Sequence, residues 1–389
     1  MRLTETALER RVKRWLLEPR DCFVQCAPGL GPTLNRELEL AGFAPTVTER
    51  AGALLRLDNA DMMRANLILR TASRVLLRLD EFHAANREAL FDHLRRFPWE
   101  VQLGFSKNYR LHVTSRNSRL QAGDEVLKTA TQAVARRMRE FGLAPVPDDD
   151  SPLQFHLRLQ DDRCTLSFNT SGEHLHRRGF RTLVGQAPVR ETIAAALALD
   201  AYVSGEHRTV VDPFCGSGVM LLELADVAGA QPPGRGRSFA FEHAAWFRPG
   251  RWRDVMRQES STRAESPELL GFDTDAGVLA SARANLEGLP ATLHDADATR
   301  LDYGELGGGL IISNLPWGVR LGDRESATRT TKKFLDAVAR SPSPWDLALL
   351  MRDPALLRQD PRFTVRDEQP VASGGLTVWR VTARSNGAR

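Results

Sequence analysis

The apolar positions of the chain follow two periods, and the period changes along the sequence. Apolar and polar residues alternate through 109–115, which predicts a strand with one buried face. Apolar residues recur at helical spacing through 124–141, which predicts a helix. Short apolar runs alternate with helical segments through 21–100, and strands at 155–159 and 164–169 are expected to form a hairpin. The N-terminal part of the chain therefore predicts two small α+β units.

From residue 209 onward, short and almost wholly apolar runs alternate with helical segments. Runs of this kind are typical of strands that are buried on both faces of a parallel sheet. The pattern predicts an α/β fold with a doubly wound sheet, while the Pro-, Gly-, Arg- and Ser-rich segment 229–267 is expected to be irregular. The expected strands are 209–212, 269–273, 291–294, 309–314, 346–351 and 376–382, and the expected helices are 188–199, 216–228, 276–286 and 331–338.

Composition places the chain among globular proteins, with 42% hydrophobic and 26% charged residues. The net charge of +4 and the isoelectric point of about 9.1 are compatible with a polyanionic partner. Cys22, Cys26, Cys164 and Cys215 have neither zinc-ligand spacing nor the density of a disulfide framework, so we expect reduced cysteines and no metal. Residues 1–20 lack the apolar core of a signal peptide, and no apolar run is long enough to span a bilayer. We therefore expect a cytoplasmic protein with no membrane partner, and the oligomeric state stays open.

A glycine turn follows the first strand of the C-terminal part. The strand ends in Asp212, and Phe214 and Cys215 lead to Gly216 and Gly218 at the start of the next helix. Glycine lets the backbone approach a ligand closely, and a helix N-terminus offers free N–H groups. The turn therefore indicates a cofactor loop, although a purely structural strand–helix turn has the same pattern. Cys215 is expected to be a small loop residue and not a nucleophile.

Aspartates end the next two strands. Asp273 is placed to accept hydrogen bonds from both hydroxyls of a ribose. Asp275 stands at a helix N-cap position, which is the role we expect for it. Asp297 is placed to accept a hydrogen bond from an adenine amine, and a turn aspartate is an equally good interpretation. With the glycine loop, these positions predict a nucleoside cofactor across the carboxyl edge of the sheet.

The strand 309–314 ends in a turn that indicates the chemistry. An amine nitrogen that attacks a methyl donor needs its lone pair freed from the aromatic ring. The side-chain oxygen of Asn314 and the carbonyl of Leu315 are placed to accept its N–H bonds, and Pro316 fixes the turn. Trp317 is suited to stack on a target base. The alternative is a strand-end turn with a packed Trp, which the three preceding cofactor signals disfavour.

These motifs resemble those of the THUMP-domain methyltransferases. Residues 212–218 are similar to the cofactor loop of that family, and residues 313–318 to its Asn-Pro-Pro-Tyr-Gly signature. Leu315 stands where the family has a proline, and Trp317 where it has Tyr or Phe. Residues 171–181 are similar to the segment that joins THUMP to the catalytic domain. The resemblance implies S-adenosylmethionine as the cofactor.

The resemblance also implies a domain order for nearly the whole chain. Residues 1–100 would form a ferredoxin-like region and residues 101–170 a THUMP RNA-binding domain. Residues 171–208 would hold a linker and the first catalytic helix, and residues 209–389 a Rossmann-like methyltransferase domain.

Residues 238–242, with Trp246 and Trp252, resemble an insertion of one branch, the RlmL-like guanine-N2 methyltransferases of bacterial large-subunit rRNA. This implies methyl transfer to the exocyclic N2 amine of a guanine in 23S rRNA or a ribosomal precursor. Three alternatives stay open. They are a tRNA guanine-N2 methyltransferase, a DNA adenine-N6 methyltransferase with a similar Asn-Pro turn, and a non-catalytic RNA-binding assembly factor.

Basic residues gather in the expected THUMP region and in the linker, where they are suited to meet RNA phosphates. For any single arginine, a solvated helix face is the plainer interpretation. His156 alternates in a strand and is expected to pack. RNA contact is open for His174 and His176, although a structural or incidental role is the plainer interpretation. The candidate RNA-binding residues are Arg116, Arg119, Lys128, Arg177, Arg178 and Arg181.

Overall fold

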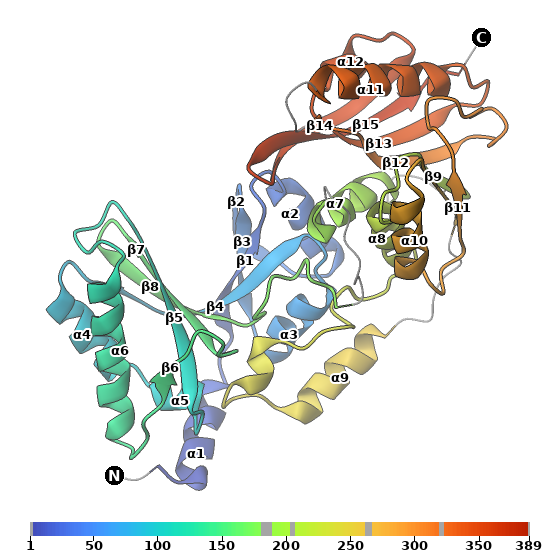
Figure 1. The fold of residues 1–389 in the computed structure, drawn as a ribbon. Helices are drawn as coiled ribbons and strands as arrows, with labels where there is room; N and C mark the ends of the chain where they lie inside the picture. Colours follow the sequence, from blue (N-terminus) through green and yellow to red (C-terminus); the bar gives the residue numbers. More distant parts are fainter. Residues whose placement is uncertain (1–2, 180–188, 203–206, 261–266, 319–322, 388–389) are drawn as a thin grey trace.

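The computed structural model describes residues 3–179, 189–202, 207–260, 267–318 and 323–387 (Figure 1). Within these ranges the strands form an N-terminal sheet of eight strands and a C-terminal sheet of seven strands. The expected α/β class is confirmed, with mixed α+β structure before a Rossmann-like domain.

The N-terminal sheet combines the two α+β units that the sequence pattern predicts. Its strand order is β2-β3-β1-β4-β8-β7-β5-β6 along the sheet. The bounds are β1 (Arg20–Cys26), β2 (Pro45–Glu49), β3 (Gly52–Leu57), β4 (Ala72–His83), β5 (Asn108–Arg116), β6 (Val146–Pro147), β7 (Gln154–Gln160) and β8 (Arg163–Asn169).

The long strand β4 joins these two units. It pairs antiparallel with β1 along one edge and with β8 along the other, so that Leu77 lies opposite both Cys22 and Phe168. All three side chains are buried, so the core is continuous across the junction. The two units therefore share one sheet.

The helices of this part connect the two units. The domain boundary expected between residues 100 and 101 falls inside α5, and α4 packs against α6 of the second unit. The bounds are α1 (Glu5–Trp15), α2 (Gly31–Leu40), α3 (Asn59–Ile68), α4 (Arg87–Arg96), α5 (Trp99–Leu103) and α6 (Asp124–Arg139).

The C-terminal sheet has five parallel strands followed by an antiparallel pair. Its order is β11-β10-β9-β12-β13-β15-β14, and β15 runs antiparallel to both β13 and β14. The strand bounds are β9 (Thr209–Asp212), β10 (Glu268–Asp273), β11 (Ala291–Asp295), β12 (Gly309–Asn314), β13 (Trp345–Met351), β14 (Phe363–Ser373) and β15 (Leu376–Ser385).

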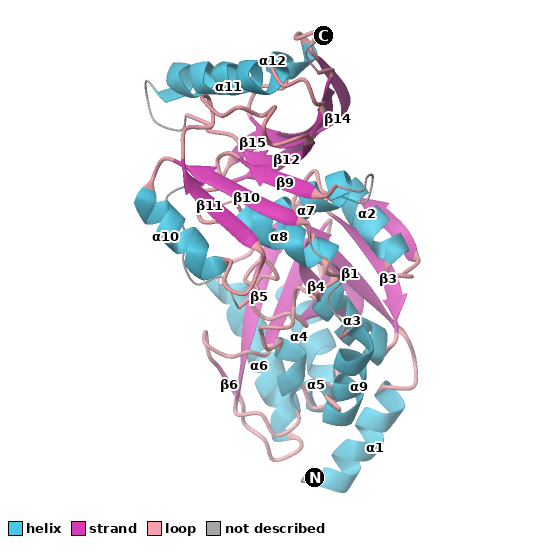
Figure 2. Ribbon diagram, turned by 90° about the vertical axis from the view of Figure 1, so that its right-hand side faces the viewer, coloured by secondary structure: helices cyan, strands magenta, loops and turns pink. Residues whose placement is uncertain are grey.

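Helices flank this sheet, and Figure 2 shows β9, β10 and β11 side by side with α10 next to them. Strand order reverses between β9 and β12, which makes the crevice outside their carboxyl ends the expected ligand site. The helix bounds are α7 (Glu191–Tyr202), α8 (Val219–Ala228), α10 (Ala276–Asn285), α11 (Asp323–Ala339) and α12 (Ala355–Arg358).

The expectation that residues 229–267 are irregular is wrong over part of that segment. It contains the short helix η1 (Ala240–His243) and the helix α9 (Pro249–Glu259), which packs on α3. Aromatic contacts explain the order, because the centre of the Phe241 ring lies 5.2 Å from that of Phe239, on which it stacks, and 5.2 Å from that of Trp252, which it meets edge to face. Because Pro, Gly and Arg are frequent in this segment, the hydrophobic pattern did not indicate the helices that these aromatic residues hold.

Buried ion pairs connect the N-terminal part to the catalytic domain. Arg178 contacts Glu223 of α8 at 3.1 Å, and each side chain is only 1% exposed. The Arg178 guanidinium also donates to the carbonyl of Arg70, and Arg70 donates to the carbonyl of Asp226. Arg380 of β15, which pairs with Asp200 of α7, also donates to the Thr33 hydroxyl of α2 at 2.9 Å. Helix α8, which follows the glycine loop, is therefore held against the N-terminal part.

Loss of the Arg178 side chain should destabilise the protein strongly, because it leaves Glu223 buried without its cation. We expect Arg178→Met to lower the free energy of unfolding by about 3 kcal/mol or more. Urea denaturation measures the change. The matched control is Arg177→Met, which removes an exposed pair with Glu173 and should cost no more than about 1 kcal/mol. Equal losses of stability in the two variants would contradict the stabilising role of the Arg178–Glu223 pair.

Candidate active site

The switch point brings three strand ends together. β9 lies between β10 and β12, with Val210 opposite Leu269 on one side and Leu310 on the other. Because all three strands run parallel, their final residues meet at one edge of the sheet. These residues are Asp212, Asp273 and Asn314, so the structure brings together three positions that the sequence predicts.

The carboxyl group of Asp212 is buried at this edge and is 1% exposed. Its Oδ1 accepts hydrogen bonds from the Ser313 hydroxyl at 2.6 Å and from the backbone N–H of Phe214 at 3.2 Å. Burial raises the pKa of Asp212 to about 7, against the opposing effect of these hydrogen bonds. The carboxyl group is therefore poised to change its charge near neutral pH.

The glycine loop is tied to the end of β10. The Cys215 N–H donates to the carbonyl of Phe272, and the Gly216 N–H donates to Asp273 Oδ2 at 2.9 Å. Gly216 has a φ of +51°, and a Cβ built on it would meet only Val278 at 3.9 Å. Gly218 has a φ of +83°, and a Cβ there would lie 2.9 Å from Leu286. Gly218 thus serves close packing, while Gly216 leaves open space beside the loop.

Asp273 and Asp275 make different contacts at the end of β10. Asp273 Oδ1 accepts from the N–H of Asp275 at 3.1 Å, so both Asp273 oxygens hold the backbone around the strand end. Asp275 caps α10 through the N–H groups of Gly277 and Val278, which confirms its expected capping role. Asp273 remains half-buried at the edge, where a ribose would reach it.

The Asp297 carboxylate accepts hydrogen bonds from within its own turn. Its Oδ1 accepts from the N–H of Thr299 at 2.9 Å and from the Thr299 hydroxyl at 2.8 Å. These bonds hold the pKa of the Asp297 carboxyl below its ordinary value. Arg300 lies 3.6 Å from Oδ2. The structure thus supports the turn interpretation of Asp297, and contact with an adenine stays a prediction.

The turn after β12 is held by a hydrogen bond to the neighbouring strand β13. The N–H of Leu315 donates to the carbonyl of Leu350 at 3.0 Å, and the Leu315 side chain is buried in the core. Pro316 is exposed, while Trp317 is half-buried and packs against the apolar core. The Leu at position 315 therefore anchors the turn by packing, and Trp317 is partly held against the core.

Three polar atoms at this edge are buried without a hydrogen-bond partner among the described residues. They are Asp212 Oδ2, Asn314 Oδ1 and Trp317 Nε1. An unpartnered buried polar atom costs about 1–3 kcal/mol, and native proteins contain few of them. Two acceptors and one donor at a switch point fit a ligand rich in amines and hydroxyls, and Gly216 leaves room beside them. The residues present therefore fit a nucleoside cofactor and an amine-bearing base.

Cys215 lies in the loop but is not suited to nucleophilic chemistry. It is buried, and burial raises the pKa of its thiol. Ser313 is the residue that the sequence interpretation passed over, since it was quoted only as part of the turn motif. Its position next to Asn314 at a buried strand end was the available signal.

The described candidate RNA-binding residues differ in exposure and in their partners. Arg116 and Lys128 are exposed, and Arg119 lies 3.3 Å from Asp162. Arg177 is exposed and pairs with Glu173 at 2.9 Å. The prediction for Arg178 is wrong, because its guanidinium is buried against Glu223 and could not reach RNA in this fold. Arg181 lies outside the described residues.

Two further features concern the described part of the chain only. No group of three or more His, Cys, Asp and Glu side chains there is arranged to hold a metal ion. None of its helices combines the length and the apolar character needed to cross a bilayer.

The order of the sheet and the glycine loop at its switch point define a Rossmann-like methyltransferase domain. Residues 178–371 match the family described as "RMKL-like, methyltransferase domain", and residues 21–76 match the "RlmL ferredoxin-like domain". The chain therefore belongs to the RlmL-like methyltransferases.

Known proteins resemble the chain along most of its length. It is 32% identical over 346 residues to the ribosomal RNA large subunit methyltransferase K/L of Methylococcus capsulatus, which covers 85% of this chain and 47% of that protein. The chain thus spans about half the length of the curated relatives it matches. The crystal structure of a possible methylase from Clostridium difficile 630 is 25% identical, with a TM-score of 0.82 and coverage of 96% and 99% of the two chains. That of SMU.472, complexed with SAH, is also 25% identical, with a TM-score of 0.81 and the same coverage.

The pKa of Asp212 predicts a distinct pH dependence of stability. Because the folded-state pKa is raised, protonation of this carboxyl stabilises the fold. That contribution is fully present below the pKa of an unfolded Asp and is lost as the pH rises through about 7. Asp212→Asn keeps an acceptor for Ser313 and carries no charge. We expect the variant to gain stability relative to the native chain between pH 5 and pH 8, by a few kcal/mol, in urea denaturation.

The control for this prediction is Asp295→Asn, which exchanges an exposed carboxyl at the same edge of the sheet. It should show no such gain. If the stability difference between Asp212→Asn and the native chain is the same at both pH values, the buried carboxyl is not the titrating group.

Proposed function

We propose that the chain transfers a methyl group from S-adenosylmethionine to the exocyclic N2 amine of a guanine in 23S rRNA. The observation that carries this proposal is the unpartnered Asn314 Oδ1, which is buried at the strand end directly after Ser313, the hydrogen-bond partner of Asp212. The large-subunit rRNA methyltransferases among its relatives, and the SAH complex of a structural relative, support the choice of substrate and cofactor.

The glycine loop and its partners would hold the cofactor. S-adenosylmethionine supplies a methyl group on a positively charged sulfonium. Asp212 would offer its free Oδ2 to the cationic part of the cofactor, and such a charge favours the ionised carboxyl. Asp273 would receive the ribose, and the open space at Gly216 would let the backbone approach it. Phe214, Cys215 and Gly218 would shape the loop, and Asp297 would reach the adenine.

Asn314 and its neighbours would position the target base. Asn314 Oδ1 and the carbonyl of Leu315 would accept the two N–H bonds of the amine and turn its lone pair away from the ring. Pro316 would hold the carbonyl in place, and Trp317 would stack on the base. The N2 nitrogen would bond to the methyl carbon as the methyl–sulfur bond breaks, S-adenosylhomocysteine would leave, and the excess proton of the methylated amine would pass to solvent. Orientation supplies most of the rate enhancement in such a scheme, so no strong general base is required.

The decisive experiment is label transfer from radioactive S-adenosylmethionine to unmodified 23S rRNA, 16S rRNA, tRNA and DNA, followed by nucleoside analysis. We expect label in 23S rRNA as N2-methylguanosine. At saturating S-adenosylmethionine, Asn314→Ala should lower the rate by about 100-fold or more, since it removes an acceptor aimed at the reacting group. The matched control is Asn386→Ala, at an exposed site in the same domain, which should leave the rate unchanged.

Other outcomes would replace the proposal. N2-methylguanosine in tRNA would retain the chemistry and change the substrate, and N6-methyladenine in DNA would overturn the RNA assignment. Cofactor binding without label in any nucleic acid would favour the non-catalytic assembly factor.

A further inference from the structure

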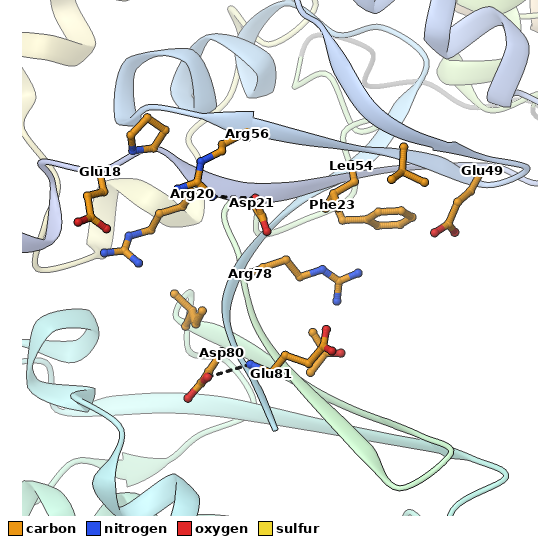
Figure 3. A pocket seen from close by; sticks show the side chains of 14 residues that line it. Glu18, Arg20, Asp21, Phe23, Glu49, Leu54, Arg56, Arg78, Asp80 and Glu81 are labelled. Carbon is orange, nitrogen blue, oxygen red and sulfur yellow. Dashed lines mark hydrogen bonds and ion pairs between the residues drawn. The ribbon is translucent and has the colours of Figure 1, made fainter. Parts of the chain in front are cut away.

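Buried carboxylates in this protein generally have a partner for each oxygen. Glu100 pairs with Arg11 at 2.8 Å, and Glu223 pairs with Arg178 at 3.1 Å. The surface pocket of about 430 Å³ where β1 and β4 meet likewise sets its carboxylates beside three guanidinium groups (Figure 3). Among the buried residues that the structure describes, Asp212 is the one carboxylate with a buried oxygen that has no partner. A ligand at this edge of the sheet would therefore meet a carboxyl group whose second oxygen is free.

Ser313 determines which oxygen of Asp212 is free. The Ser313 side chain is fully buried, and its hydroxyl donates to Asp212 Oδ1 at 2.6 Å. The N–H of Phe214 donates to the same oxygen at 3.2 Å. Backbone pairing between β9 and β12 reaches Val211 and Ile311, so the bond from Ser313 joins the two strands beyond their paired residues. Because both donors hold Oδ1, the carboxyl group cannot rotate without losing them, and Oδ2 is the oxygen left for a ligand.

Among the described residues, the titratable groups that interact with the Asp212 carboxyl carry no positive charge. They are Asp273 at the end of β10, Cys215 in the glycine loop and Tyr303 in the segment before β12. Burial raises the pKa of the Cys215 thiol and of the Tyr303 hydroxyl, so both stay protonated near neutral pH. Arg283 of α10 lowers the pKa of Cys215 against this effect of burial. A positive charge for Asp212 therefore has to come from a ligand.

Opposing effects set the charge of Asp212 in the free protein. Burial raises its pKa to about 7, and the hydrogen bond from Ser313 is the largest effect in the opposite direction. A proton bound to this carboxyl group occupies Oδ2, because Oδ1 already accepts two hydrogen bonds. A cation that meets Oδ2 takes the place of that proton, and the proton passes to solvent.

We propose that Ser313 is a positioning residue of the cofactor site, which holds Asp212 so that its free Oδ2 receives a cationic group of S-adenosylmethionine. Binding of the cofactor then releases the proton of Asp212 to solvent, so the affinity rises with pH until the free carboxyl group is already ionised. S-adenosylmethionine carries an α-ammonium group and a sulfonium, and S-adenosylhomocysteine keeps only the first. The inference rests on the proposed function for the place of the cofactor at this edge, and not for the choice of nucleic acid.

The test measures the affinity of the full chain for S-adenosylmethionine and for S-adenosylhomocysteine by isothermal titration calorimetry, without nucleic acid. The range from about pH 5 to about pH 7 lies below that in which an α-amino group loses its proton. We expect the affinity of the native chain for S-adenosylmethionine to rise about tenfold or more over this range. Repetition in buffers of different ionisation enthalpy measures the released proton directly. Asp212→Asn should bind more weakly and should lose both the pH dependence and the proton release.

Ser313→Ala should shift this pH dependence upward. Without the hydroxyl, the pKa of Asp212 in the free protein rises further, so the affinity should fall about tenfold near pH 7 and only about twofold near pH 8.5. Ser313→Thr keeps a hydroxyl and should restore the native profile. The matched control is Ser341→Ala, which removes another buried serine hydroxyl of the same domain, one that donates to the carbonyl of Ser343 at 2.8 Å. It should leave the profile unchanged.

A purely structural role of Ser313 would lower the affinity by the same factor at every pH, and this result would overturn the proposal. An affinity of the native chain that does not change with pH for either compound would also overturn it. An equal rise for both compounds supports the proposal with the α-ammonium group as the cation, and a rise for S-adenosylmethionine alone supports it with the sulfonium. Because these measurements involve no nucleic acid, a failure of methyl transfer to 23S rRNA would leave their outcome unchanged.

Discussion

The catalytic part of the molecule depends on one buried carboxylate between parallel strands. Asp212 ends β9 and receives the Ser313 hydroxyl of β12, so a side-chain hydrogen bond spans the two strands where their order reverses. The same residue shapes the glycine loop through the N–H of Phe214. Because these polar groups are buried, each needs a partner, and the unpartnered atoms of Asp212, Asn314 and Trp317 mark where a ligand would supply one.

A second constraint joins this edge to the rest of the chain. Helix α8 begins at the glycine loop and carries Glu223, whose buried charge is matched by Arg178 of the linker. The N-terminal part and the cofactor loop are thus coupled through one helix. In the N-terminal part, β4 plays the corresponding role, since it unites both α+β units into one sheet.

Much of the catalytic fold could be predicted from the sequence, because buried parallel strands leave an apolar run that few other elements produce. Asp212, Asp273 and Asn314 were identifiable since each ends such a run. Helix α9 was not predicted, because frequent Pro, Gly and Arg interrupt the hydrophobic pattern, and the contacts of Phe239 and Phe241 with Trp252 are visible only in the structure. Arg178 was misjudged for a related reason, since nothing local distinguishes an arginine in water from one paired with a distant Glu223.

By itself, the sequence determined the elements, the glycine loop and the order of residues at the strand ends, because periodicity and turn chemistry are local properties. Only the tertiary structure decided which of these groups share an environment. It placed Ser313 against Asp212, turned Asp297 toward Thr299, and buried Arg178. The physical reason is that burial, charge pairing and strand register depend on residues far apart in the chain, and these decide whether a polar side chain is free to bind a ligand.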